Sequence, residues 1–388
     1  MKSVKPWDNV KWITTHLPDK PFIYEPKWGS WIEKEHTELT HLKNRIETLE
    51  NQGLWEYRKK LVNPYELVYT QDDSKMPPSL AKVKPLSRSY FKMIELLKAL
   101  NFFKDKPISI NSAHVCEGPG GFIQALADLC EKEKVKLNIA LAMTLRPTES
   151  QIPGWRRAVP FLQKHKEVKI VYGADSTGDI YKEENQASFV ASLEGHKAQI
   201  FTADGGFDFQ LNYTEQEQTS FRLIVSSFSA GFRVLEIGGA IIIKIFDIFG
   251  QPTLQLLWFL SLHFKSWTIH KPAMSRPCNS ERYFIGKGFI GQTSESYAIL
   301  QSLQSDLEKR PSGTLSSLFN LDFDSEFKKA IQNFQKDAEV QQIQTLKEAL
   351  ELTDTEEIRK EIWKRAYKIG EEWCESFEIP YAFCRTAT

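Results

Sequence analysis

The sequence predicts an α/β fold in which a mostly parallel, seven-stranded sheet is covered by helices on both faces. From residue 107 onward, short apolar runs alternate with stretches of helical periodicity, which is the pattern of such a sheet. The last two apolar runs are joined by a loop alone, so one of these strands is expected to be antiparallel. A hydrophobic content of 41% in 388 residues is ample for the core.

The expected elements follow in chain order. Residues 87–100 have helical spacing, and Ser87 is a candidate N-cap. Further helical patterns cover 122–131, 217–235 and 254–263. The seven strands are expected at 113–116, 138–143, 168–172, 199–203, 240–246, 267–270 and 283–287.

The chain outside this region is expected to form additions packed on the core. Residues 1–30 are rich in Pro, Trp and Lys and are expected to wrap over the surface, and 39–49 have helical spacing that ends near Gly53. Charged helical patterns follow at 331–352 and 356–373. The predicted regions are an N-terminal extension at 1–85, the α/β domain at 86–295 and a C-terminal helical appendage at 296–388.

Charge and cysteine content limit the class of protein. Lys+Arg and Asp+Glu both total 50, so any nucleic-acid binding must come from a local patch. The five cysteines form no C-x-x-C pair, which favours free thiols in a reducing compartment. No apolar stretch is long enough to span a membrane, and the N-terminus lacks a signal-peptide core. We expect a soluble, intracellular protein, nuclear or cytoplasmic.

A glycine-rich turn follows the first strand run and is the clearest candidate for a ligand site, because open α/β folds bind nucleotides at this edge. No Lys-Ser or Lys-Thr follows its glycines, and Ile123 stands where a dinucleotide fingerprint needs its third glycine. A ligand without phosphate, S-adenosylmethionine, fits a glycine turn with carboxylates nearby. Glu117, Asp179 and Asp204 could supply those carboxylates.

A lysine inside an apolar strand run, Lys244, is the second unusual feature. Burying it costs free energy unless it is paired or has a function. With its pKa lowered toward about 7–8 it would be a general base, and Lys92 could supply the like charge that lowers it. Asp204 and Glu281 act in the opposite direction and would orient the ammonium groups. The alternative is a solvent-facing lysine on an edge strand, and the other three residues each have an ordinary structural explanation.

Five motifs occur in order within residues 85–290. They are Ser-Arg-Ser-Tyr-Phe-Lys, Cys-Glu-Gly-Pro-Gly-Gly-Phe, Ala-Asp-Gly-Gly-Phe, Lys-Ile-Phe-Asp and Ser-Arg-Pro-Cys-Asn-Ser-Glu-Arg-Tyr. Together they resemble the FtsJ-like RNA 2′-O-methyltransferases. The resemblance implies a Rossmann-like S-adenosylmethionine-dependent methyltransferase fold. It also implies a catalytic tetrad at Lys92, Asp204, Lys244 and Glu281.

The resemblance also implies where S-adenosylmethionine binds, with Asp179 against the adenine. The implied cofactor-binding residues are Cys116, Glu117, Gly118, Pro119, Gly120, Gly121, Phe122, Thr144, Asp179, Ile180 and Asp204. Met143-Thr144-Leu145 and Phe246-Asp247-Ile248-Phe249 are similar to the messenger-RNA cap branch of the family, as are the long flanking segments. The Cys116-Glu117 pair departs from the usual motif, and the acid expected after the second strand is missing, which leaves the ribose contact open.

The implied substrate is capped RNA, with a protein of the capping machinery as a further expected partner and no metal. Candidate RNA contacts are Arg88, Phe249, Arg276, Asn279 and Arg282, since arginines position phosphates. Stacking on a methylated guanine needs aromatic faces, and Trp28, Trp31, Trp155 and Phe249 are candidates. The alternatives are methylation of ribosomal or transfer RNA, and a catalytically silent RNA-binding subunit.

Overall fold

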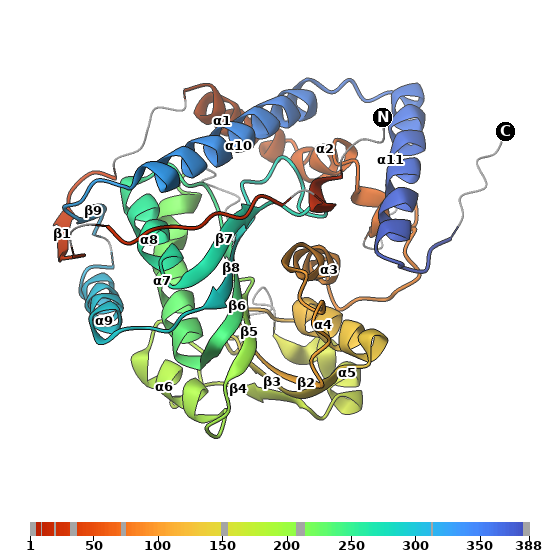
Figure 1. Cartoon of the computed structure of the whole chain (residues 1–388). Helices are drawn as coiled ribbons and strands as arrows, with labels where there is room; N and C mark the ends of the chain where they lie inside the picture. Colours follow the sequence, from red (N-terminus) through yellow and green to blue (C-terminus); the bar gives the residue numbers. More distant parts are fainter. Residues whose placement is uncertain are drawn as a thin grey trace.

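The structure is a computed structural model and describes residues 5–8, 10–18, 21–31, 37–70, 75–148, 154–206, 214–311 and 313–382. A seven-stranded sheet with the order β4-β3-β2-β5-β6-β8-β7 lies at its centre (Figure 1). The strands are β2 (Ser109–Val115), β3 (Lys136–Met143), β4 (Val168–Val171), β5 (Ala198–Ala203), β6 (Leu235–Ile245), β7 (Phe264–His270) and β8 (Arg282–Phe289).

The sheet confirms the predicted fold class. Neighbouring strands from β4 to β6 pair in parallel, and β8 pairs antiparallel with both β6 and β7. All seven predicted strands exist, but β2 and β6 begin four or five residues before the predicted start. Their first residues include Ser109, Glu236 and Gly238, which carry no apolar signal, because these strand beginnings are only partly covered.

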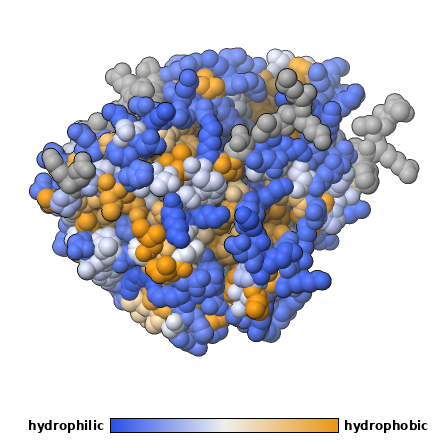
Figure 2. Space-filling view, in the orientation of Figure 1, coloured by the Kyte–Doolittle hydropathy of each residue, from blue (hydrophilic) through white to orange (hydrophobic). Residues whose placement is uncertain are grey.

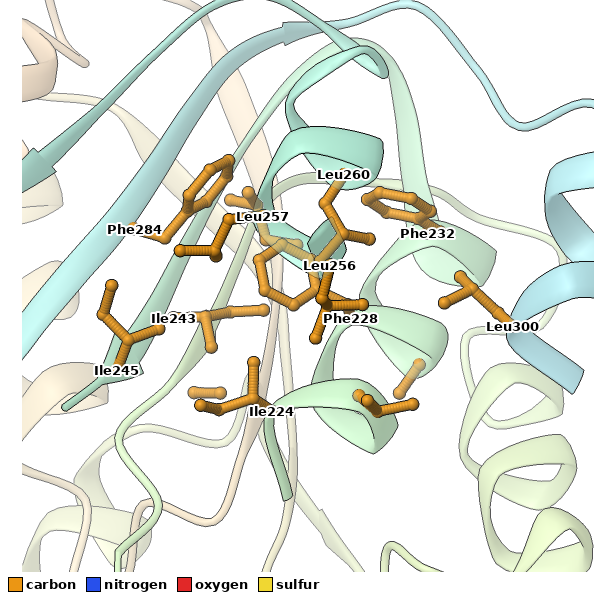
Figure 3. Close-up of a cluster of buried hydrophobic side chains, with 14 of the residues drawn as sticks. Ile224, Phe228, Phe232, Ile243, Ile245, Leu256, Leu257, Leu260, Phe284 and Leu300 are labelled. Carbon is orange, nitrogen blue, oxygen red and sulfur yellow. The ribbon is translucent and has the colours of Figure 1, made fainter. Parts of the chain in front are cut away.

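Helices cover both faces of the sheet. On one side lie α3 (Ser89–Leu100), α4 (Gly121–Glu133) and α5 (Val159–Lys164), and on the other α6 (Glu183–Ala191), α7 (Gln216–Val234), α8 (Gln251–Ser261) and α9 (Ser294–Lys309) (Figure 1). In Figure 3, Phe228 of α7 and Leu257 of α8 pack against Ile243 and Phe284 of the sheet, and Phe232 of α7 lies beside Leu260 of α8. Burial of such large apolar side chains is the main stabilising contribution to the fold.

The N-cap prediction for the first of these helices is wrong. α3 begins at Ser89 with Arg88 at its N-cap position and no side-chain cap. The Ser87 hydroxyl lies 2.6 Å from the hydroxyl of Ser89 instead.

The terminal regions are joined to each other as well as to the core. β1 (Tyr24–Trp28) pairs antiparallel with β9 (Leu315–Phe319), and α1 (Thr37–Asn51) packs on α10 (Ser325–Glu351). The sequence predicted a wholly helical C-terminal region, but β9 is a five-residue strand. Among the described residues it pairs with β1 alone, from the opposite end of the chain. The remaining elements are η1 (Pro6–Asp8), α2 (Trp55–Leu61), η2 (Glu66–Val68), η3 (Trp155–Ala158) and α11 (Glu356–Ser376).

The surface in Figure 2 is mainly hydrophilic, with hydrophobic residues in small groups. In the part of the chain that the structure describes, no helix is both long and apolar enough to cross a membrane. Among the same residues, Cys116, Cys130, Cys278 and Cys374 are free thiols, as predicted. Cys384 lies outside the described residues.

Candidate active site

The glycine-rich turn connects the end of β2 to the start of α4. The Cys116 N–H donates to the Met143 carbonyl at the end of β3 (2.8 Å), and Cys116 and Gly120 both have positive φ. A Cβ atom on Gly121 would lie 2.3 Å from Oγ of Ser89. Only glycine therefore allows α4 to begin this close to α3, the helix that carries Lys92. Phe122 follows fully buried against the Tyr283 ring.

The loop after β4 meets the end of β3 beside this turn. Gly178 has a φ of +72°, and a Cβ there would lie 1.9 Å from the Thr144 carbonyl oxygen. The close approach brings Asp179 next to the turn, where its charge helps to raise the pKa of the Cys116 thiol to about 12, although burial is the larger cause. Thr144 and Ile180 are buried beside it.

The residues predicted to hold S-adenosylmethionine are thus brought together at one edge of the sheet. Asp179 is partly exposed, and one of its oxygens accepts the Tyr181 N–H (2.9 Å). Glu117 is turned inward, where it accepts the Thr202 hydroxyl and lies 3.2 Å from Nδ1 of His114. The Glu117 oxygen nearest that ring nitrogen is Oε2, which is buried and makes no hydrogen bond of good geometry among the described residues. The partly exposed Asp179 beside the glycine turn is the carboxylate that fits a ligand with hydrogen-bond donors.

The four tetrad residues come from four elements and form one chain of ion pairs. Nζ of Lys92 on α3 lies 2.6 Å from Oε1 of Glu281, just before β8. Nζ of Lys244 on β6 lies 3.2 Å from Oδ1 of Asp204, after β5, and 3.9 Å from Oε2 of Glu281. All four side chains are 11–14% exposed, which excludes a solvent-facing lysine on an edge strand.

The electrostatics of Lys244 differ from the prediction of a lowered pKa. Burial lowers the pKa of Lys244, but the charges of Asp204 and Glu281 outweigh burial and raise it above the ordinary lysine value. Burial likewise raises the pKa of Glu281, and the ammonium groups of Lys92 and Lys244 outweigh it and hold that pKa well below the ordinary value. Both carboxylates lie within 4 Å of Nζ, whereas the nearest lysine, Lys92, is paired with Glu281, so in this arrangement Lys244 is an ammonium at neutral pH.

Two residues that the sequence analysis missed hold the tetrad in place. The buried Tyr283 hydroxyl donates to Oδ1 of Asp204 (2.7 Å). Nζ of Lys271 donates to the carbonyls of Asn279 (2.7 Å) and Glu281 (3.0 Å), which ties down the loop that carries Glu281. Tyr283 follows Glu281 by two residues and lies in the predicted last strand, so an alternation argument could have placed it on the site face. Nothing in the sequence singles out Lys271.

Glu95, one helical turn after Lys92, is a further positioning residue. Its buried carboxylate accepts the N–H groups of Ala273 (2.7 Å) and Met274 (2.9 Å) and Nε1 of Trp373 (3.0 Å). It thus joins the lysine-bearing helix α3 to the loop that leads to Glu281, and Trp373 brings α11 into the same network.

For the methyl transfer that the family resemblance implies, we expect Trp373→Phe to lower kcat by about three- to tenfold and to leave the Kd for the implied S-adenosylmethionine unchanged. The variant removes one hydrogen bond to a carboxylate, worth about 1.5–3 kcal/mol, without removing the ring. Trp7→Phe is the matched control, because Nε1 of Trp7 is buried with no partner among the described residues. Equal losses in the two variants would assign the effect of Trp373 to packing alone.

Two of the predicted RNA-binding arginines line one cavity. No tetrad residue is in its wall, but the charge of Glu281 acts on both arginines, which places the cavity near the tetrad. The cavity has a volume of about 140 Å³ and is also lined by Lys60 and Thr70 of the N-terminal extension. Arg276 donates to both oxygens of the buried Glu66 (2.8 and 3.0 Å), and Arg88 donates to the Tyr69 carbonyl (2.6 Å). Both arginines are thus partly committed to structural partners.

The other predicted RNA-binding residues are not part of the wall of this cavity. Phe249 is buried between α1 and α10, where it packs with Leu42 and Leu346, so the prediction that it stacks on a base is wrong for this arrangement. Arg282 is 5% exposed and lines a separate cavity bordered by α10. Asn279 lines a small cavity of about 10 Å³ beside Lys43 of α1. Terminal helices that come from distant sequence cover these positions.

Most of the aromatic rings that were candidates for stacking on the cap already pack against other groups of the protein. Trp155 is buried against Gly120 of the turn, and Trp31 packs edge-on against Phe221. Trp28 is partly exposed, and the Arg310 guanidinium lies 4.7 Å from its ring centroid. None of these rings lines the cavity next to the tetrad.

A buried carboxyl on α7 makes stability depend on pH. Glu217 accepts the N–H groups of Phe249 and Gly250 (both 2.9 Å), and burial raises its pKa from 4.5 to about 8. Between these values the folded chain holds a proton that the unfolded chain has released, so this group's contribution to the free energy of unfolding falls as pH rises. The buried Lys271, whose pKa burial and Arg282 lower well below the usual value, acts in the opposite direction.

We therefore expect the stability of wild type and of Glu217→Gln to depend differently on pH. From pH 6.5 to 8, the wild type should lose stability relative to Glu217→Gln, by up to about 2 kcal/mol. Denaturant unfolding at several pH values measures the difference. Glu184→Gln, at an exposed site on α6, should show no such trend. The burial argument would be contradicted if the difference in free energy of unfolding between wild type and Glu217→Gln did not change with pH, or if it moved in favour of wild type as pH rises.

The chain is similar to known methyltransferases over most of its length. It is 28% identical over 284 residues to cap-specific mRNA (nucleoside-2′-O-)-methyltransferase 1 of Trypanosoma cruzi, covering 69% of this chain and 76% of that protein. The corresponding protein of Dictyostelium discoideum is 31% identical over 282 residues, which is 69% of this chain but 36% of that protein. The cap-specific mRNA (nucleoside-2′-O-)-methyltransferase of Autographa californica nuclear polyhedrosis virus is 31% identical over 175 residues, 44% of this chain and 61% of that protein.

The match to a protein family covers the domain that carries the site. Residues 85–289, more than half of the chain, match the family described as FtsJ-like methyltransferase. The matched region contains the glycine turn, Asp179 and all four tetrad residues. The chain therefore belongs to the FtsJ-like methyltransferase family.

Proposed function

We propose that this protein transfers a methyl group from S-adenosylmethionine to a ribose 2′-hydroxyl near the 5′ cap of messenger RNA. The observation that carries the proposal is the chain of ion pairs from Lys92 through Glu281 and Lys244 to Asp204. Two lysines held by two carboxylates at a strand edge suit an unactivated hydroxyl. The names of the relatives support capped messenger RNA as the substrate class.

S-adenosylmethionine supplies an electrophilic methyl group on a positively charged sulfur. The turn from Cys116 to Gly121 would hold it, with Asp179 as the acceptor for its adenine end and Asp204 on the side of the tetrad. Glu117 would support the turn from within, held by Thr202 and His114. The contribution of these residues is to fix the ligand beside Lys244, which converts a bimolecular encounter into a positioned one.

Lys244 orients the 2′-hydroxyl and accepts its proton. Asp204 and Glu281 raise the pKa of Lys244, so the deprotonated amine is scarce at neutral pH. With the positively charged sulfur of S-adenosylmethionine bound next to Nζ, that pKa would be lower and the fraction of deprotonated amine larger. Lys92 holds Glu281 in position. The Tyr283 hydroxyl holds Asp204, so each carboxylate is oriented by a partner outside the reaction.

The cavity lined by Arg88, Arg276 and Lys60 is the proposed path of the RNA backbone. Its three cations exceed the one charge of Glu66, and phosphate contacts of this kind position RNA without reading its sequence. Part of the cavity wall comes from the N-terminal extension, which gives that region a role in substrate binding.

The test compares methyl transfer from labelled S-adenosylmethionine to one short RNA with a methylguanosine cap, with an unmethylated cap and without a cap. Ribosomal and transfer RNA transcripts serve as competitors. We expect labelling of the capped RNA to exceed that of the uncapped RNA at least tenfold. Equal labelling with and without the cap, or preferred labelling of the transcripts, would replace the cap assignment by another RNA substrate. No labelling of any RNA despite cofactor binding would contradict the proposed activity of this chain by itself.

A further inference from the structure

A second cavity, of about 300 Å³, lies where the edge of the main sheet meets both terminal regions. Its wall includes His270 and Lys271 at the end of β7, Arg282 at the start of β8, Lys11 of the N-terminal segment and Asp337 of α10. In Figure 1, α10 passes above the upper ends of these strands. The only acidic side chain in this wall is Asp337, within the described residues.

Two deeply buried side chains in this wall have nitrogen atoms without a partner. Arg282 is 5% exposed, and its Nη1 donates to the Ser280 carbonyl (2.7 Å). Its Nη2, and Nε2 of His270, which is 7% exposed, make no hydrogen bond within the described part of the chain. Folded proteins rarely leave such groups unpaired, and those that remain commonly meet water, an ion or a ligand.

Basic side chains outnumber acidic ones in the cavity wall, which also favours an anionic ligand. Lys11, Lys271 and Arg282 are basic, and Asp337 is the one acidic side chain of the wall within the described residues. Burial, and then the charge of Arg282, lower the pKa of Lys271 well below its usual value, and burial lowers the pKa of Arg282 and of His270. Asp247 and Glu281, outside this wall, favour the charged forms of Arg282 and Lys271, but burial outweighs them, and a bound anion would oppose the effect of burial.

We propose that this cavity binds an oxyanion of the phosphate class, with the Arg282 guanidinium as its principal ligand and His270 and Lys11 beside it. Guanidinium groups match the geometry of phosphate oxygens with two parallel N–H donors. The phosphate can belong to the backbone of a bound RNA or to a free phosphate compound. The site is separate from the cavity next to the tetrad, so it exists whether or not the chain methylates RNA.

The test is calorimetric titration of the full chain with pyrophosphate at low ionic strength. Arg282→Gln should weaken binding at least about tenfold, because it removes a charge-assisted pair of hydrogen bonds. Asp337→Asn should tighten binding about two- to fivefold, because it removes a like charge at the rim. Arg310→Gln, an arginine on the Trp28 ring outside this wall, is the matched control and should leave affinity unchanged.

The tightening in Asp337→Asn keeps the test valid if Arg282→Gln fails to fold, because misfolding does not strengthen binding. Pyrophosphate that does not bind wild type below about 10 mM, a far weaker limit than functional anion sites need, would overturn the proposal. So would an affinity that neither variant changes.

A second arm separates the two sources of phosphate. Fluorescence anisotropy measures the affinity of a short labelled RNA for wild type, Arg282→Gln and Asp337→Asn. RNA affinity that follows pyrophosphate affinity across the variants assigns the site to the RNA backbone. RNA affinity that stays constant while pyrophosphate affinity changes assigns it to a free phosphate compound. Either result supports the oxyanion site.

Discussion

Replacing Lys244 by alanine is expected to lower kcat for methyl transfer by about 10³-fold, within the 10²–10⁴ range of a positioned proton acceptor. Nζ of Lys244 is the only lysine nitrogen that contacts both Asp204 and Glu281 in the described structure. The side chain contacts none of the turn residues in an ion pair, so the Kd for S-adenosylmethionine should change less than about threefold, a small effect by comparison. Single-turnover transfer and calorimetric titration measure the two quantities.

Lys244→Arg and Lys169→Ala are the control variants. Arginine keeps the positive charge but does not give up its proton at accessible pH, so it should be as inactive as alanine. Lys169 lies on β4 of the same sheet with an exposed side chain that pairs with Glu194 (3.3 Å), and its loss should leave kcat unchanged. Activity retained in Lys244→Arg would mean that this position supplies a charge and accepts no proton.

Glu281→Gln is expected to lower kcat at the pH optimum about 10²-fold and to move the pH–rate profile to lower pH. The carboxylate holds Lys92 at 2.6 Å and helps to raise the pKa of Lys244. Removing an anion beside an ammonium lowers the pKa of that ammonium. Because the rate increases as Lys244 loses its proton, the rising limb of the variant should have its midpoint at lower pH than that of wild type.

The profile is measured as kcat against pH from 6.5 to 10, with saturating substrates. Glu236→Gln is the matched control, since Glu236 lies at the opposite end of β6 and accepts the Gln199 amide. A midpoint that stays in place or rises in Glu281→Gln would show that the titrating group is not Lys244.

The resemblance to the family implied the tetrad as a set, and three of its four residues also sit at positions that a local pattern defines. Asp204 follows a strand run, Lys244 lies inside one and Glu281 precedes one, and parallel strands bring such ends to one edge. Glycine is required at Gly121 and Gly178 because two backbone segments approach closely at each position and leave no room for a Cβ atom. Strand ends account for Asp204, Lys244 and Glu281, whereas Lys92 lies on α3 and was placed in the tetrad only by the resemblance.

The sequence could not predict the direction of the Lys244 pKa shift or which side chains are buried under the terminal helices. Both depend on contacts between distant parts of the chain. The sign of the Lys244 pKa shift follows from distances of 3.2 and 3.9 Å, which no spacing rule gives. Phe249 is buried because α1 and α10, nearly 300 residues apart in sequence, close over it. Glu95 is a positioning residue only because Trp373 and the loop at Ala273 fold back onto α3.

The most direct test of the central claim is the position of the transferred methyl group. Capped RNA is methylated by the purified chain and digested to nucleosides, and mass spectrometry locates the added methyl group. The account predicts methylation of a ribose 2′-oxygen near the cap in wild type and none in Lys244→Ala. A methyl group on a base, or on an internal nucleotide irrespective of the cap, would contradict it.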